Sequence, residues 1–218
     1  MERVEDIIKE LGKILDNLRS PDKAKRDEAW KKVEYLVDTG NGNYIPLGYL
    51  RSLLWHKLQG VRDDAWSHLT VYKALLVKGV EKALTADSDR IKWSAWSHVL
   101  DLINLGIVDK EKVIEVRNSY WRLLKSRWVT IRKKAWRLFV TLVKEGIFLP
   151  KDKERYFDFL KHRKPSVRIY AWEASLKLQE LGFVTKEDLI SNIEFLKELT
   201  QKESSIKKRA IKVLERLT

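Results

Sequence analysis

Ile131-Arg132-Lys133-Lys134-Ala135-Trp136 decides the fold, because its basic-x-x-Ala-Trp pattern recurs along the whole chain. The copies occupy residues 25–30, 61–66, 91–96, 131–136, 167–172 and 206–211, with isoleucine in place of tryptophan in the last copy. Successive alanines of the pattern lie 36, 30, 40, 36 and 39 residues apart. This period is typical of repeats made of two helices. The pattern therefore predicts an all-α solenoid of about six helical hairpins.

The repeats are expected to form one domain over residues 1–218, with approximate limits at 1–40, 41–74, 75–106, 107–146, 147–182 and 183–218. Each copy of the pattern lies on the second helix of its hairpin. Apolar residues three and four apart predict the first helices at residues 3–18, 45–58, 75–84, 109–126, 150–162 and 186–199. Glycine follows the pattern alanine by eleven residues at Gly40, Gly106, Gly146 and Gly182, where it can end a helix in the left-handed conformation.

The segment from Lys164 to Ala171, Lys-Pro-Ser-Val-Arg-Ile-Tyr-Ala, resembles the start of the second helix in HEAT repeats, Asp-Pro-x-Val-Arg-x-x-Ala. The resemblance covers nearly the whole chain. It implies a right-handed superhelix with the second helices on the concave side, and a role in binding rather than a particular activity. The acidic residue that usually faces the repeat arginine is replaced by Trp128 and Lys164. We therefore expect Arg132 and Arg168 to lack carboxylate partners and to be free to bind phosphate.

Composition excludes several classes of protein. Hydrophobic residues make up 44% of the chain, enough for a sizeable core, and the absence of cysteine excludes disulfides and thiolate chemistry. No apolar run approaches the roughly 20 residues of a membrane span, and the charged N-terminus does not resemble a signal peptide. We expect an intracellular protein, in the cytoplasm or on the chromosome. A charged fraction of 34% gives it a thermophile-like composition.

The positive charge is concentrated in one part of the chain. The net charge is +13, and residues 111–168 hold 17 basic and 6 acidic residues. A basic band of this kind favours nucleic acid as the partner, DNA rather than RNA, bound through phosphates in repeats 4 and 5. The expected contacts are Arg127, Trp128, Arg132, Lys133, Lys134, Arg137, Lys161, Arg163, Lys164 and Arg168. The alternatives are an inert solvated surface and a scaffold that binds an acidic protein.

The tryptophans of the pattern have two interpretations. A basic residue and a tryptophan four positions later lie on the same face of a helix. If that face is concave, Trp66, Trp96, Trp136 and Trp172 are available to stack on bases. If it lies between repeats, these indoles belong to the core, which is the usual environment of tryptophan.

Catalytic chemistry is not expected. The sequence shows no nucleophile and base pair, no metal-binding spacing and no cofactor motif, so no catalytic residue, metal or cofactor is predicted. Size and charge are similar to the HEAT-like alkylpurine DNA glycosylases, whose catalytic aspartate lies one helical turn beyond a tryptophan. Here that spacing gives Glu34, Thr70, Leu100, Val140 and Leu176, and Asp101 is one position out of register. We therefore expect a non-enzymatic binding protein without membrane contact.

Overall fold

The computed structural model describes residues 3–201 and 203–218, and every regular element in them is a helix. Met1 and Glu2 of the charged N-terminus lie outside the described residues. The chain forms two compact units, unit 1 (Met1–Lys112) and unit 2 (Val113–Thr218). The boundary in the sequence falls inside the expected fourth repeat. The all-α class is confirmed, whereas the grouping of six repeats into one domain over 1–218 stays a prediction.

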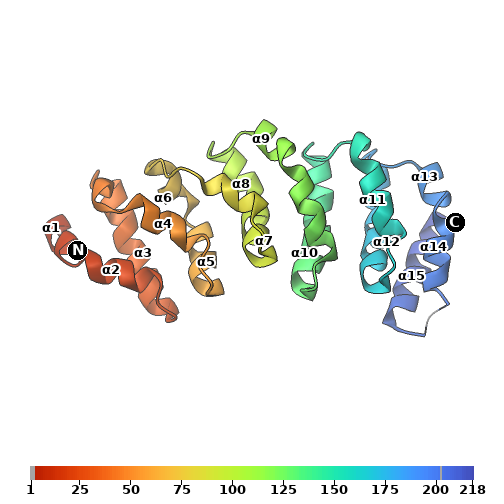
Figure 1. Ribbon diagram of the computed structural model, residues 1–218, viewed down its shortest axis with the longest axis horizontal. Coiled ribbons are helices and arrows are strands. Elements are labelled where there is room, and N and C mark those ends of the chain that lie inside the picture. Colours follow the sequence, from red (N-terminus) through yellow and green to blue (C-terminus); the bar gives the residue numbers. More distant parts are fainter. Residues whose placement is uncertain (1–2, 202) are drawn as a thin grey trace. The chain divides into compact units, whose positions relative to one another are not determined.

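Unit 1 contains three repeats, drawn in red to yellow in Figure 1. Repeat 1 consists of α1 (Val4–Lys9), α2 (Leu11–Leu18) and α3 (Lys23–Asp38). Repeat 2 consists of η1 (Gly42–Tyr44), α4 (Leu47–Leu53), α5 (Gln59–Trp66) and α6 (Leu69–Ala74). Repeat 3 consists of η2 (Val80–Thr85), α7 (Asp89–Ser97) and α8 (Val99–Asn104). The helix α5 packs against both α3 and α7, so the second helices lie side by side.

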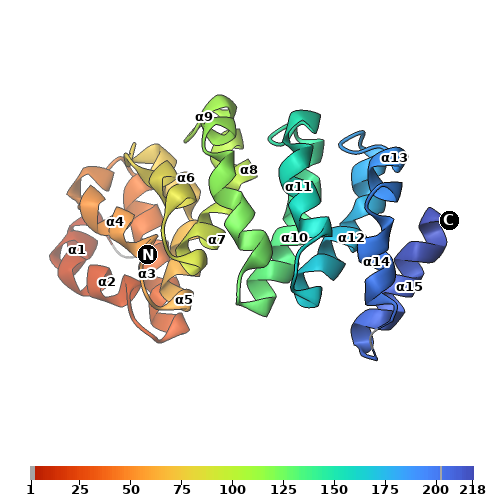
Figure 2. The same cartoon turned by 45° about the vertical axis from the view of Figure 1, so that its right-hand side comes forward.

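Unit 2 contains the other three hairpins, drawn in green to blue in Figure 1. The helix α9 (Lys110–Glu115) spans the division between the units, and η3 (Arg117–Lys125) and α10 (Val129–Lys144) follow it. Repeat 5 consists of η4 (Pro150–Asp152), α11 (Lys153–Leu160) and α12 (Pro165–Glu180). Repeat 6 consists of α13 (Lys186–Ile190), α14 (Ile193–Leu199) and α15 (Ser205–Leu217). The second helix α12 packs between α10 and α15 (Figures 1 and 2).

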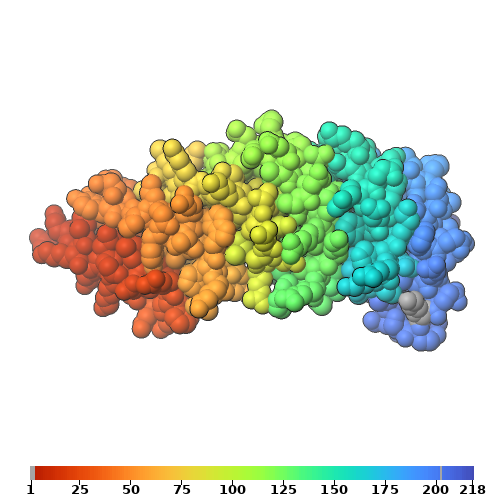
Figure 3. All heavy atoms as spheres, viewed as in Figure 1, coloured from red at the N-terminus to blue at the C-terminus, as the bar shows by residue number. Residues whose placement is uncertain are grey.

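In repeats 2 to 5 the pattern tryptophan fixes the hairpin by a hydrogen bond to the first helix, whereas the Nε1 of Trp30 in repeat 1 is buried without a hydrogen-bond partner. The indole Nε1–H of Trp66, Trp96, Trp136 and Trp172 donates to the backbone carbonyl of the leucine twelve residues earlier, at 2.9 to 3.1 Å. These indoles are at most 3% exposed. Side chains fill the spaces between neighbouring helices of unit 2 on the face in Figure 3. The pattern tryptophans of repeats 2 to 5 are therefore part of the core, and this hydrogen bond satisfies the one polar atom of each indole that burial would leave without water.

The basic residue of the pattern closes the turn between the two helices. Arg26, Arg62, Arg132 and Arg168 each donate to the backbone carbonyl six residues earlier, at 2.7 to 2.9 Å. All four side chains are buried. The guanidinium groups of Arg132 and Arg168 do not lie over the tryptophan four residues later, although the two residues share a helix face. Their guanidinium groups lie over Tyr170 and Phe195 of the following repeat, each 5.8 Å from the ring centre.

The repeat glycines end the second helices as predicted. Gly40, Gly106, Gly146 and Gly182 have φ angles between 72° and 78°, a left-handed conformation that side chains with a Cβ rarely adopt. The chain turns there into the first helix of the next repeat. These turns set the register of successive hairpins, so the pattern residues of neighbouring second helices come to equivalent positions.

Two second helices of unit 1 are interrupted after the pattern tryptophan. In repeat 2 the Ser67 hydroxyl donates to the Asp64 carbonyl at 2.8 Å, and His68 Nδ1 lies 2.6 Å from the same oxygen. In repeat 3 the Ser97 hydroxyl and His98 Nδ1 contact the Ser94 carbonyl at 2.8 and 3.0 Å. Side chains that compete for a helix carbonyl favour a break. Repeats 4 and 5 have Leu138 and Ala174 at the histidine position, and α10 and α12 each continue unbroken for 16 residues.

Candidate nucleic-acid interface

Exposure divides the predicted phosphate contacts into two groups. Arg132 and Arg168 are buried. The other cations are exposed, and none of them forms an ion pair with a carboxylate in the described part of the chain. These exposed cations are Arg127, Lys133, Lys134, Arg137, Lys161, Arg163 and Lys164. Direct contact with a polyanion is therefore open to them without the loss of an existing pair.

The expectation that Arg168 lacks a carboxylate partner is wrong. Its Nη1 lies 2.8 Å from Glu198 Oε2, and it also donates to the Phe195 carbonyl at 3.1 Å. Arg132 has no such carboxylate among the described residues, yet its Nε is buried without a hydrogen-bond partner. The position four residues before the repeat arginine does not supply its partner even where it is acidic: in repeat 1 it is Asp22, which caps helix α3 by accepting from the Ala24 amide, and Arg26 pairs with Asp64. Neither arginine is in a position to reach a ligand.

The partner of the repeat arginine comes from the next repeat. Arg26 Nε donates to Asp64 Oδ2 at 2.7 Å, and Arg62 Nε donates to the Ser94 hydroxyl at 2.9 Å. Asp64 and Ser94 both stand two residues after the basic position of their own repeat. Tyr170 is the equivalent residue in repeat 5, and it offers Arg132 only a ring. The sequence contains this register, but it becomes visible only after successive repeats are aligned with each other.

The exposed cations of the two turns form one group, the turn cluster (Lys125, Arg127, Lys161, Arg163 and Lys164). A small hollow of about 220 Å³ is lined by Lys125 from the first turn and His162 from the second. Burial lowers the pKa of His162, and the positive charges of Lys125, Lys164 and Arg163 lower it further. The two turns are therefore close enough to act as a single positive patch. Lys125 belongs to this patch although the sequence analysis did not select it.

Trp128 lies at the edge of the turn cluster and is 37% exposed. The guanidinium carbon of Arg127 lies 5.0 Å from the centre of its ring. Trp128 also occupies the N-cap position of α10, and Lys164 occupies the N-cap position of α12, and neither side chain caps its helix. Uncapped N-termini leave backbone N–H groups and the positive end of the helix dipole available to an anion. The side chains and the helix ends thus favour the same kind of ligand.

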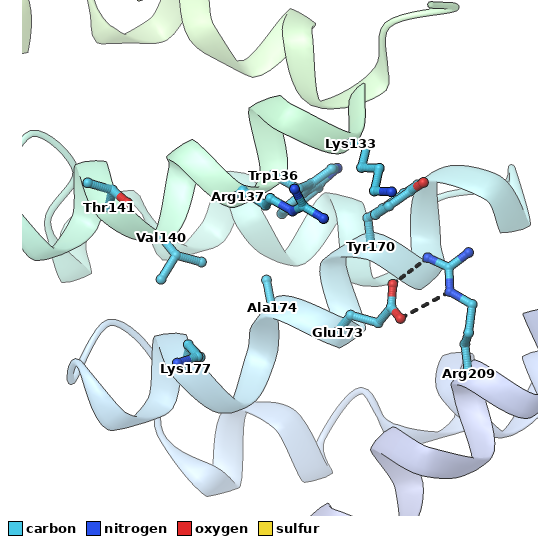
Figure 4. Close-up of a pocket in the computed structure, with 10 residues that line it drawn as sticks. All are labelled: Lys133, Trp136, Arg137, Val140, Thr141, Tyr170, Glu173, Ala174, Lys177 and Arg209. Atoms are coloured by element: carbon cyan, nitrogen blue, oxygen red, sulfur yellow. Dashed lines mark hydrogen bonds and ion pairs between the residues drawn. The ribbon is translucent and has the colours of Figure 1, made fainter. Parts of the chain in front are cut away.

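A larger hollow of about 710 Å³ opens on the second helices of unit 2, shown in Figure 4. Its α10 wall carries Lys133, Trp136 and Arg137, and the opposite wall is formed by α12. The predicted contacts Lys133 and Arg137 thus share one site. Trp136 reaches this hollow only with the small exposed part of its side chain, whereas Trp66, Trp96 and Trp172 are at most 1% exposed.

The α12 wall adds residues that the sequence analysis missed. Tyr170, Glu173 and Lys177 line it, and Arg209 reaches in from α15 to form an ion pair with Glu173. The guanidinium carbon of Arg209 lies 4.8 Å from the Tyr170 ring centre. Figure 4 shows this pair at one end of the hollow and Lys177 at the other. A search for runs of charge does not find these residues, because they lie on two helices, α12 and α15, that only the fold brings together with α10.

Residues considered for catalysis lie elsewhere. Glu34, which has the spacing of the glycosylase aspartate, belongs to unit 1, and its Oε1 lies 3.1 Å from His68 Nε2. Asp101 is exposed on α8. Within residues 3–201 and 203–218, no three histidine or carboxylate side chains converge to hold a metal ion, and no helix is long and apolar enough to cross a membrane. The candidate site is therefore a surface of cations and aromatic rings.

Comparison with known proteins adds to this description. No protein-family model matches the chain. A segment of 73 residues is 32% identical to the "uncharacterized protein in sor 5'region" of Acidianus ambivalens, and it covers 34% of this chain and 32% of that protein. The chain thus spans about a third of the length of this relative.

Several solved structures are similar in fold, at low sequence identity. The designed armadillo repeat protein YIII(Dq.V1)4CPAF, solved in complex with peptide (KR)4, is 16% identical with a TM-score of 0.46, covering 96% of this chain and 100% of that one. The designed armadillo repeat protein YIII(Dq)4CqI is 16% identical with a TM-score of 0.43, covering 94% and 99%. These likenesses are too distant to bear on function. The helices and their repeated contacts define the chain as an all-α helical-repeat protein.

Proposed function

We propose that this protein binds nucleic acid without catalysis, and that duplex DNA is held through its phosphates by the turn cluster and the neighbouring exposed face of α10. The observation that carries the proposal is the gathering of exposed cations without carboxylate partners at two adjacent turns. Lys133, Lys134 and Arg137 extend this positive surface along α10. Contacts of this kind recognise the backbone, so we expect weak dependence on base sequence.

The charge of the two units supports this location. Unit 1 has 19 basic and 18 acidic residues, a net charge of +1, whereas unit 2 has 25 basic and 13 acidic residues, a net charge of +12. A polyanion is attracted by such a field over several ångströms, and its counterions are released on binding. Unit 2 alone therefore has the charge that nucleic-acid binding requires.

The test is a titration of labelled duplex DNA, followed by fluorescence anisotropy at several salt concentrations. We expect log Kd to rise steeply with log salt, by roughly 0.9 per phosphate contact. The substitution Arg163→Glu should weaken binding on the order of tenfold and reduce the slope. Its matched control is Lys57→Glu, because His56-Lys57 occupies the same turn of repeat 2 as His162-Arg163 does in repeat 5. An affinity that is insensitive to salt, or equal losses in both variants, contradicts the proposal.

The buried arginines are not suitable for this test. Arg132→Glu or Arg168→Glu would place a carboxylate in a buried site and destabilise the fold whether or not DNA binds. An acidic protein is the alternative partner, and it would compete for the same cations. Co-purification of an acidic protein after nuclease treatment, together with no DNA binding at about 0.15 M salt, would favour that alternative.

A further inference from the structure

The two seams between repeats inside unit 1 each cover a pattern tryptophan with a histidine ring. The His68 imidazole stacks on Trp30 of the preceding repeat, with ring centres 4.2 Å apart and an angle of 8° between the planes. His98 lies over Trp66 in the same way, at 5.8 Å and 26°. In the first seam Glu34 also pairs with His68. A flat ring of the chain itself thus fills the position beside these indoles.

The seam between repeats 4 and 5, in unit 2, has no such histidine ring beside its pattern tryptophan, Trp136. Ala174 stands where His68 and His98 stand, six residues after the basic position, and Val140 stands where Glu34 stands. Both residues line the 710 Å³ hollow beside Trp136. The hollow therefore lies where a missing imidazole and its carboxylate partner would be, and its surface there is formed by the apolar side chains of Val140 and Ala174. A flat ring is the shape that this position accommodates elsewhere in the protein.

The rim of the hollow is positive. Lys133, Arg137 and Lys177 are exposed around it, and none of them has an ion-paired carboxylate in the described ranges. Its single acidic residue, Glu173, is neutralised by Arg209. An arginine at the mouth of such a site can also stack on a heterocyclic base. The hollow combines a place for a ring with cations for an attached anion.

We propose that this hollow binds one unpaired nucleotide, with its base in the position of the missing imidazole and its phosphates at Lys133, Arg137 and Lys177. The inference rests on the proposed function and adds a preference for nucleic acid that has an unpaired base. A nucleotide carries both required groups, the flat ring and the phosphate. An aromatic side chain of a peptide supplies only the ring, and the net charge of +12 in unit 2 favours the denser anion.

The experiment compares two single strands of equal length, an oligodeoxyadenylate and a strand of abasic sites, by anisotropy at one salt concentration. Both have the same phosphates, so a difference in Kd reports the base. We expect the oligodeoxyadenylate to bind about tenfold more tightly. Ala174→His fills the hollow as unit 1 does, and Ala174→Leu fills it without a polar group. Both variants should remove the preference and leave binding of the abasic strand unchanged.

Two results overturn the inference: equal binding of the two strands by the native protein, or an unchanged preference in both filled variants. His98→Ala is the control, because it opens the equivalent seam in unit 1 and should add no base preference. If neither strand binds, the proposed function fails, and the Ala174 methyl resonance is then followed in separate titrations with adenosine monophosphate, ribose phosphate and an acidic aromatic peptide. A shift with the nucleotide alone supports the hollow. No shift, equal shifts, or a shift only with an acidic aromatic peptide overturns it.

Discussion

The second helix of repeat 2 stops at Trp66 and resumes at Leu69, whereas the second helix of repeat 5 runs unbroken from Pro165 to Glu180. The difference follows from two residues, because Ser67 and His68 compete for a helix carbonyl and Glu173 and Ala174 do not. The same histidine that interrupts the helix covers the tryptophan of the previous repeat. Unit 1 thus closes its seam with its own side chains, and unit 2 leaves a positively charged hollow.

Substitutions in the core should cause the largest loss of unfolding free energy in both units. Trp172→Ala removes a fully buried indole and its hydrogen bond to the Leu160 carbonyl. We expect a loss of unfolding free energy of about 3–5 kcal/mol, measured by urea denaturation. Trp66→Ala is the matched change in unit 1 and should cost a similar amount. Hydrogen exchange locates each effect, and a loss below 1 kcal/mol in either variant would contradict the hairpin role of the indole.

The buried arginines should differ between the units. Arg26→Met removes the closer cation of Asp64, at 2.7 Å, and leaves this carboxylate, which is 13% exposed, with only Lys23 at 3.6 Å. We expect a cost of about 2–4 kcal/mol. Arg132→Met removes a guanidinium that has no carboxylate partner among the described residues and has one unsatisfied nitrogen. The bond to the Ser126 carbonyl and the contact with the Tyr170 ring are lost, at about 1–2 kcal/mol. Equal costs in chemical denaturation would show that the partner in the next repeat does not matter.

The sequence predicts the repeats well because each repeat uses the same few contacts. The period, the glycine turns and the all-α class all follow from local pattern and spacing. Exposure of the cations in the turns could also be predicted. The carboxylate partner of Arg168 could not be predicted, because Glu198 is 30 residues away in the sequence. Glu198 also does not occupy the position two residues after the basic residue of the next repeat, where Asp64 and Ser94 stand. The hollow was missed for a related reason: it results from the small side chain of Ala174, and an absent group gives no signal in a sequence.

The two histidines that cover pattern tryptophans in unit 1 should differ, by a smaller amount, in their contribution to stability. His68→Ala removes a close stack on Trp30 and the contact with Glu34, for which we expect about 1–2 kcal/mol. Both substitutions also remove a contact of Nδ1 with a helix carbonyl, but His98→Ala removes only a wider stack, on Trp66, for which we expect about 0.5–1 kcal/mol. Thermal denaturation of the two variants measures the difference. The reverse order would show that helix interruption, rather than ring stacking, determines the contribution of these histidines.

The smallest expected effect is a change in the pKa of one of two equivalent histidines, which distinguishes the unit that binds DNA from the unit that does not. His56 and His162 occupy the same turn in repeats 2 and 5, and each accepts a hydrogen bond at Nδ1 from the amide two residues later, at 3.1 Å. Burial and nearby cations lower both pKa values below 6.5. Because the charged form is disfavoured in the folded state, both histidines contribute more stability above pH 6.5 and less as pH falls through the unfolded pKa of about 6.5.

Bound phosphates should act on only one of these two histidines. A duplex on the turn cluster offsets the charges of Lys125, Arg163 and Lys164, so we expect the pKa of His162 to rise by a few tenths of a unit or more. His56 faces Lys57, Arg19 and Arg62 in the nearly neutral unit and should keep its pKa. NMR titration of the imidazole protons with and without duplex DNA measures both values in one sample. Equal shifts would indicate a general response to ionic conditions, and a shift of His56 alone would place the ligand on unit 1.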